Sequence, residues 1–139
     1  MNNIELIELA KSTTEKAHLL SKKKEAWRFM GYVGAALITE AGNVYTGVNL
    51  ALLCGIGFCA ESSAIADMVK SGETKINRIV AVTNDGYVLT PCGRCRETIF
   101  QIDEINNLET EVIVHKDGSI QLMKELLPKN WQRILPQFN

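Results

Sequence analysis

Residues 60–83 read AESSAIADMVKSGETKINRIVAVT, and this stretch decides the fold class. Its first part predicts a helix over 60–70, because apolar residues recur at helical spacing and Gly72 is a typical helix stop. Its last part, 79–83, is a continuous apolar run of the kind found in buried central strands. A helix followed directly by a buried strand is the repeating unit of α/β proteins.

The flanking sequence continues this alternation of helices and strands. It predicts helices over 4–20, from Thr90-Pro91 onward and up to Pro128, and strands over 32–39, 44–49 and 111–114. Thr90 is expected to cap its helix and Pro91 to occupy the first helical position. We therefore expect a single domain over 1–139, built as a three-layer α/β/α sandwich around a mixed sheet of about five strands.

Composition excludes two classes of partner. The chain has 139 residues, of which 22% are charged, and its net charge is −1. A charge so close to zero gives no field that would attract nucleic acid or an acidic membrane surface. No segment approaches the roughly 18 apolar residues that a membrane span needs. We expect a cytoplasmic protein, in which clustered cysteines indicate metal binding or catalysis more often than disulfides.

Two cysteine-bearing segments lie at predicted helix starts: Cys59-Ala60-Glu61 and Pro91-Cys92-Gly93-Arg94-Cys95. A Cys-x-x-Cys pair at a helix start places two sulfurs on the same side of the first turn, where the helix dipole favours thiolates. Two such helix starts brought together would give three thiolates around one point. Zinc takes four ligands, so three protein ligands leave one position open, as in catalytic zinc sites.

Glu61 suits a catalytic interpretation of these segments. It lies two residues after Cys59, so its carboxylate can reach the neighbourhood of the metal without binding it. A carboxylate there can take a proton from a water activated by zinc and pass it on. Attack of that water on an amidine-like carbon, followed by loss of ammonia, is a hydrolytic deamination.

The chain resembles the cytidine deaminase family, whose signature is His-or-Cys-x-Glu followed by Pro-Cys-x-x-Cys. The likeness extends to these stretches: Val33-Gly34-Ala35-Ala36-Leu37, Thr46-Gly47-Val48-Asn49, Pro91-Cys92-Gly93-Arg94-Cys95-Arg96 and Glu125-Leu126-Leu127-Pro128. Together they cover about residues 32–131, most of the chain.

The resemblance implies a role for each matching residue. Cys59, Cys92 and Cys95 would hold one Zn²⁺ per chain, and Glu61 would carry protons. Asn49 would contact the sugar. The backbone of Ala60 and the carbonyl of Thr90 would hold the base and its leaving amino group, and Arg96 would be a cation near the ligand sulfurs. The resemblance also implies a small cytosine-type substrate and a homotetramer.

One departure from the family pattern concerns the substrate. Nucleoside deaminases of the family carry Asn-x-Glu on the second strand, and this Glu holds the ribose hydroxyls, but here that position is Ala51. The loop between Asn49 and Cys59 is also about one residue shorter. In these respects the chain is closer in pattern to blasticidin S deaminase-like members. The expected reaction is conversion of a cytosine-containing nucleoside or analogue to the uracil form, or, as an alternative, deamination of a blasticidin S-type antibiotic specifically.

Two other interpretations compete with this one. In the first, Cys54 joins the other cysteines in a closed four-cysteine structural zinc site without catalysis; otherwise Cys54 is expected to be a small buried apolar residue. In the second, the protein deaminates nucleic acid. The near-neutral charge and the 6% of aromatic residues argue against that reading, which needs a basic channel and stacking aromatics.

Overall fold

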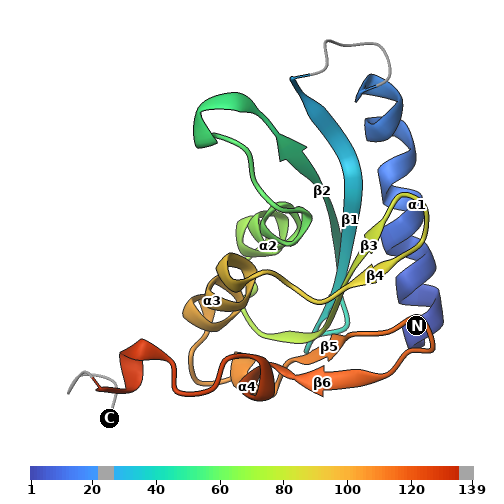
Figure 1. Cartoon of the computed structure of the whole chain (residues 1–139). Helices are drawn as coiled ribbons and strands as arrows, with labels where there is room; N and C mark the ends of the chain where they lie inside the picture. The colour runs from blue at the N-terminus through green and yellow to red at the C-terminus, as the bar shows by residue number, and fades with distance from the viewer. Residues whose placement is uncertain (22–26, 135–139) are drawn as a thin grey trace.

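The sheet has six strands and carries helices on both faces (Figure 1). The structure, a computed structural model, describes residues 1–21 and 27–134. The helices are α1 (Asn3–Ser21), α2 (Ala60–Lys70), α3 (Gly93–Ile102) and α4 (Met123–Leu126), with 3₁₀ turns at Leu53–Gly55, Asn107–Glu109 and Trp131–Ile134. The strands are β1 (Phe29–Thr39), β2 (Val44–Ala51), β3 (Ile76–Thr83), β4 (Val88–Leu89), β5 (Glu111–Ile113) and β6 (Ile120–Leu122).

The strand order is β2-β1-β3-β5-β6, and β4 also pairs with β3. β3 and β5 are parallel, whereas the other paired strands are antiparallel, so the sheet is mixed as predicted. The expected number of about five strands becomes six, because two very short strands, β4 and β6, were not predicted. The three-layer α/β/α sandwich is confirmed.

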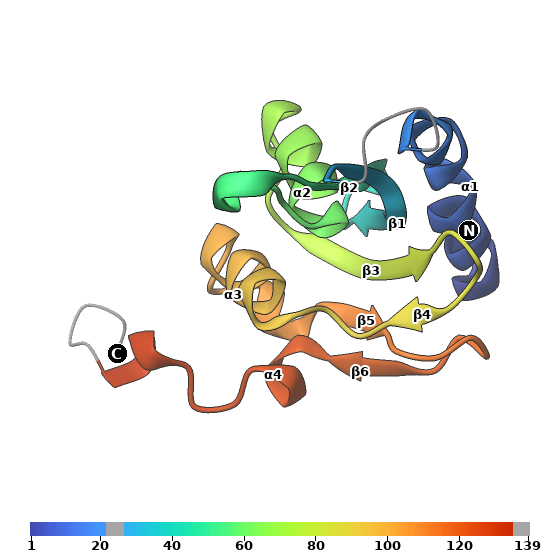
Figure 2. The same cartoon turned by 45° about the horizontal axis from the view of Figure 1, so that its top comes forward.

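Each face of the sheet has its own hydrophobic core. On one face α1 places Leu6 and Ala10 against alternate residues of the central strands, among them Ala36 and Val80. On the other face α2, α3 and α4 cover the intervening residues. That core holds Ala35, Leu37, Ala64, Ile65, Met68, Ile79, Ile99 and Met123. Figure 2 shows α1 alone on its side of the sheet, with α2 and α3 together on the opposite side.

Two glycines let the helices approach the sheet closely. A Cβ atom on Gly47 of β2 would lie well inside contact distance of the backbone nitrogen of Ala64 in α2, and one on Gly34 of β1 would do the same with the Ala10 carbonyl oxygen in α1. Neither site has room for a side chain. The first turns of α2 therefore rest directly on the backbone of β2.

The start of α3 differs from the prediction. The helix begins at Gly93, with Cys92 as its N-cap in an extended conformation, and not at Thr90-Pro91. The first helical bond runs from the Arg96 N–H to the Cys92 carbonyl, at 3.0 Å. Thr90 thus lies in the approach to the helix and does not cap it.

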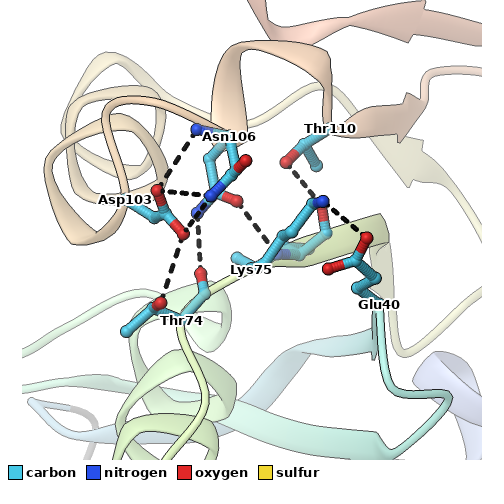
Figure 3. A network of polar contacts seen from close by, with 8 residues as sticks. Glu40, Thr74, Lys75, Asp103, Asn106 and Thr110 are labelled. Atoms are coloured by element: carbon cyan, nitrogen blue, oxygen red, sulfur yellow. Dashed lines mark hydrogen bonds and ion pairs between the residues drawn. The ribbon is translucent and has the colours of Figure 1, made fainter.

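The far end of α3 is anchored by buried Asn107. Its Nδ2 donates to the carbonyls of Ile99 and Thr74, at 2.9 Å each, and its Oδ1 accepts from the Ile76 N–H at 2.9 Å. Figure 3 shows the surrounding contacts, in which Thr74 donates to Asp103 at 3.2 Å. This network ties the C-terminal end of α3 to the start of β3.

No helix within residues 1–21 and 27–134 combines the length and the apolar character needed to cross a membrane.

Candidate active site

A pocket of about 540 Å³ opens where the N-termini of α2 and α3 meet the end of β2. Its walls come from β1, from β2 and the loop after it, from the start of α2, and from the segment that joins β4 to α3. The lining residues are Val33, Asn49, Leu50, Ala51, Leu52, Gly55, Gly57, Phe58, Cys59, Ala60, Glu61, Leu89, Thr90, Cys92 and Arg94. The pocket therefore contains most of the residues expected to carry the chemistry.

Cys59, Cys92 and Cys95 form a group in which all three Sγ atoms lie within 4.8 Å of one another. The Sγ atoms of Cys59 and Cys92 are 3.6 Å apart. Zinc–sulfur bonds of about 2.3 Å in tetrahedral geometry place two ligand sulfurs about 3.8 Å apart. The spacing and the chemistry of these donors therefore fit zinc.

The ends of the two helices create the environment of these sulfurs. Cys59 is the N-cap of α2 and Cys92 is the N-cap of α3, and neither helix has a side-chain capping hydrogen bond. Burial alone would raise the pKa of the Cys92 thiol, but the backbone N–H groups of Cys95 and Arg94, together with the neighbouring thiols, lower it. The helix N-terminus thus stabilises a thiolate at Cys92, as the sequence pattern predicted.

The pKa values of the other two thiols, Cys95 and Cys59, are raised. Burial raises the pKa of Cys95, and the negative charge of Glu61 raises it further. Burial also raises the pKa of Cys59, as does its hydrogen bond with Cys92. Three thiols this close repel one another as thiolates, so the group needs a cation to hold all three deprotonated.

Glu61 lies at the floor of the pocket beside the sulfurs. It is the second residue of α2, its side chain is only 5% exposed, and its Oε2 is 3.5 Å from the Cys95 Sγ. A carboxylate so buried, adjacent to a metal-type cluster and facing a cavity, is typical of a catalytic group.

The expected substrate-binding residues Asn49, Ala60 and Thr90 all line this pocket. The Asn49 side chain is held by its Oδ1, which accepts a hydrogen bond from the Val33 N–H at 2.9 Å. This bond leaves the Asn49 amide NH₂ as the group that can donate to a ligand.

Arg96 lies beside the start of α3, and its bonds go to backbone carbonyls. Its Nε donates to the Pro91 carbonyl at 2.8 Å, and its Nη1 donates to the Leu126 carbonyl at 3.0 Å. It therefore fastens the residue before Cys92 to the end of α4. The role of Arg96 as a cation near the ligand sulfurs stays a prediction, and its hydrogen bonds within the described residues go to carbonyl oxygens.

Cys54 does not join the three-sulfur group. All four cysteines lie in the described part of the chain, and the cluster there contains Cys59, Cys92 and Cys95 alone. The four-cysteine structural site is therefore wrong for this structure. The expectation that Cys54 is buried is also wrong, because it is exposed on a 3₁₀ turn with a φ of 62°.

Several pocket residues had no expected role. They include Val33, Leu52, Phe58, Leu89 and Arg94. For Arg94 a signal was present, because it stands between the two cysteines of the Cys-x-x-Cys motif. The apolar residues carried no such signal, because contacts between distant parts of the chain bring them together: Val33 lies on β1, Leu89 on β4, and Leu52 and Phe58 in the loop after β2.

Comparisons with known proteins agree with the metal-type geometry of this site. The family model described as the cytidine and deoxycytidylate deaminase zinc-binding region matches residues 7–110. A cytidine deaminase of Mycobacterium tuberculosis is 34% identical over 70 residues, which are 50% of this chain and 53% of that protein. The blasticidin-S deaminase of Bacillus cereus is 29% identical over 142 residues, covering 94% of this chain and 93% of that one.

A solved structure supports the same relationship. The crystal structure of cytidine deaminase from Burkholderia pseudomallei aligns with a TM-score of 0.72 at 28% identity, covering 93% of this chain and 98% of that one. The alignment with the Mycobacterium protein spans only about half of its length, whereas the family model matches most of this chain. This protein therefore belongs to the cytidine and deoxycytidylate deaminase family, whose shared region binds zinc.

Proposed function

We propose that this protein is a zinc-dependent hydrolytic deaminase that converts a cytosine-containing nucleoside or nucleoside analogue to the uracil form and releases ammonia. The observation that carries the proposal is the Glu61 carboxylate beside three clustered thiols at the floor of a pocket of about 540 Å³. That volume lies in the range of ordinary small-molecule sites. We place this activity in the cytoplasm, as expected from the sequence.

In this proposal Cys59, Cys92 and Cys95 hold the zinc, which when bound supplies water activated as a nucleophile near neutral pH. Glu61 accepts a proton from the attacking water on its carboxylate. It passes this proton to the ring nitrogen as the water oxygen bonds to the carbon that bears the amino group. It then moves the remaining proton of that oxygen to the amino group, which leaves as ammonia as its bond to the carbon breaks. The backbone of Ala60 and the Thr90 carbonyl hold the base so that its amino group faces Glu61.

The sugar end of the pocket favours a modified substrate. Ala51 lines the pocket where nucleoside deaminases of the family carry a carboxylate for the ribose hydroxyls. A hydrogen bond to a charged group is worth about 1.5–3 kcal/mol, so its absence costs roughly 10- to 100-fold in transition-state binding. The length of the match with the Bacillus cereus blasticidin-S deaminase points in the same direction, toward a blasticidin S-type antibiotic as a specific alternative.

Substrate preference tests the proposal. We expect the zinc-loaded protein to deaminate cytosine compounds, with kcat/KM for blasticidin S above that for cytidine. The Ala51→Glu variant should shift the ratio toward cytidine by roughly 10- to 100-fold. A screen of cytosine, cytidine, deoxycytidine and blasticidin S, followed by loss of the cytosine absorbance, measures the activity on each compound and the ratio of kcat/KM values.

A matched control for this variant is Ala66→Glu, which adds the same charge on an exposed position of α2 outside the pocket. It should leave the ratio as in the wild type. Wild-type efficiency on cytidine near the diffusional range, unchanged by Ala51→Glu, would show that position 51 does not contact the sugar.

We also predict a homotetramer. Support comes from large apolar side chains that are exposed next to the pocket: Leu53 is 58% exposed and Ile56 is 67% exposed, on the turn that follows β2. Exposed apolar residues grouped at a site are typical of interfaces. Light scattering should give about four times the chain mass, and an active monomer would contradict this prediction.

A further inference from the structure

The charges of the pocket are arranged by depth. Glu61, 5% exposed, lies at the floor with Ala60, which is 1% exposed. Arg94 and Ala51 line the same pocket and are exposed, as is Cys92, so these three residues lie where the pocket opens to solvent, which is its rim. Among the described lining residues, Arg94 is the sole lysine or arginine.

The arrangement of buried and exposed lining residues determines which end of a substrate meets Arg94. This inference rests on the proposed function. The amino group that is removed must reach Glu61, which is buried beside the Cys95 sulfur. The base therefore fills the deep part of the pocket, and the group attached to the base lies toward the rim. There it meets Arg94 and Ala51, and Ala51 offers no carboxylate to oppose the positive charge of Arg94.

Within residues 1–21 and 27–134, the fold makes no use of the guanidinium of Arg94. Among the described residues its contact is a backbone one, in which the Thr98 hydroxyl donates to the Arg94 carbonyl at 2.8 Å, and no ion pair or hydrogen bond there involves its guanidinium. Arg96, two residues further along the same helix, is the opposite case, because its guanidinium is bonded to two backbone carbonyls. Arg94 thus brings free donors and a permanent positive charge to the rim.

We propose that Arg94 is a specificity-determining residue that binds an anionic group, a carboxylate or a phosphate, on the sugar side of a cytosine substrate. A guanidinium is planar and carries donors in a fork that matches both anions. The pocket then combines a floor suited to a neutral base with a rim suited to an anion.

A second role for Arg94 makes a different prediction. Its charge could offset the negative charge of the thiolates and of Glu61, which would aid every substrate equally. If Arg94 has that role, Arg94→Ala lowers kcat for neutral and anionic substrates by the same factor. If Arg94 binds the anion, Arg94→Ala lowers kcat/KM selectively for anionic substrates, mainly by raising KM.

The experiment compares cytidine, cytidine 5′-monophosphate and the 5′-carboxylic acid of cytidine. These three are assayed on zinc-loaded wild type, Arg94→Ala and Arg94→Lys, and on Lys116→Ala, which removes an exposed positive charge that does not line the pocket. We expect wild type to prefer one of the two anionic compounds over cytidine, and the preferred one identifies the anion. The preference should fall about 10- to 100-fold in Arg94→Ala and less in Arg94→Lys, which keeps the charge but loses the fork, and should persist in Lys116→Ala.

Calorimetric binding of uridine and uridine 5′-monophosphate, or of the corresponding acid, repeats the comparison without turnover. If no cytosine compound is deaminated while the anionic uridine compound still binds through Arg94, the proposed function fails and the anion site stands. If cytidine is deaminated as well as either anionic compound, or if Arg94→Ala lowers kcat equally for all three, the anion site is wrong and the proposed function stands.

Discussion

The Glu61→Gln variant is expected to fold and bind zinc like the wild type while turning over its substrate at least about 10²-fold more slowly. Glutamine keeps the shape of the side chain but cannot accept or release a proton. In the structure Glu61 is buried 3.5 Å from the Cys95 Sγ, so no bulk water replaces it as proton carrier. Zinc content, thermal unfolding and single-turnover rates measure the three quantities separately.

A matched control for this variant is Glu104→Gln, which removes the same charge from an exposed residue after α3. It should leave turnover unchanged. Turnover by Glu61→Gln within a few-fold of the wild type would remove Glu61 from the reaction and return the protein to a structural interpretation of its metal site.

Loss of a cysteine from the three-sulfur group is expected to have the second large effect. Cys95 is fully buried, and its replacement by serine leaves a hydroxyl that does not ionise at neutral pH in place of a thiolate. Zinc affinity should fall by more than the roughly 10- to 100-fold that loss of an outer-sphere partner costs. Activity should fall with it. Competition with a chromophoric chelator and elemental analysis measure the affinity and the stoichiometry, which should be one zinc per wild-type chain.

Two further variants keep this prediction testable if Cys95→Ser unfolds. Cys59→Ser alters a half-buried member of the group and should lose zinc with a smaller cost in stability. Cys54→Ser should keep one zinc per chain, because Cys54 lies outside the group. Zinc loss in Cys54→Ser would restore the four-cysteine site.

The sequence predicted the features that depend on interactions between residues near one another in the chain. The helix over 60–70 was predicted with the bounds that the structure shows, because its end is marked by residues near in sequence: the Glu73 N–H closes onto the Met68 carbonyl at 3.2 Å. The grouping of Cys59, Cys92 and Cys95 was also predictable. Thiols at two helix starts carry a strong metal signal whatever the surrounding fold.

Features that depend on distant contacts were missed. β4 has two residues and β6 three, too few to show a period of alternation, and each exists because a neighbouring strand pairs with it. The start of α3 was placed early because Thr90-Pro91 is a common helix start. In the structure the Pro91 carbonyl is instead taken by Arg96, and Cys92 is the extended residue before the helix.

The contact of Gly47 with α2 has a consequence for protein engineering. Positions near this contact resist substitution, whereas exposed positions of the pocket can be diversified. Because a Cβ at position 47 would overlap the Ala64 backbone nitrogen, any side chain there would lift the helix that carries Glu61 and shift it relative to Cys92. Libraries that seek new substrates should therefore leave Gly47 and its neighbours in α2 untouched. Substitutions are best concentrated at exposed lining residues, such as Ala51 at the end of β2 and the side chain of Arg94 in the first turn of α3.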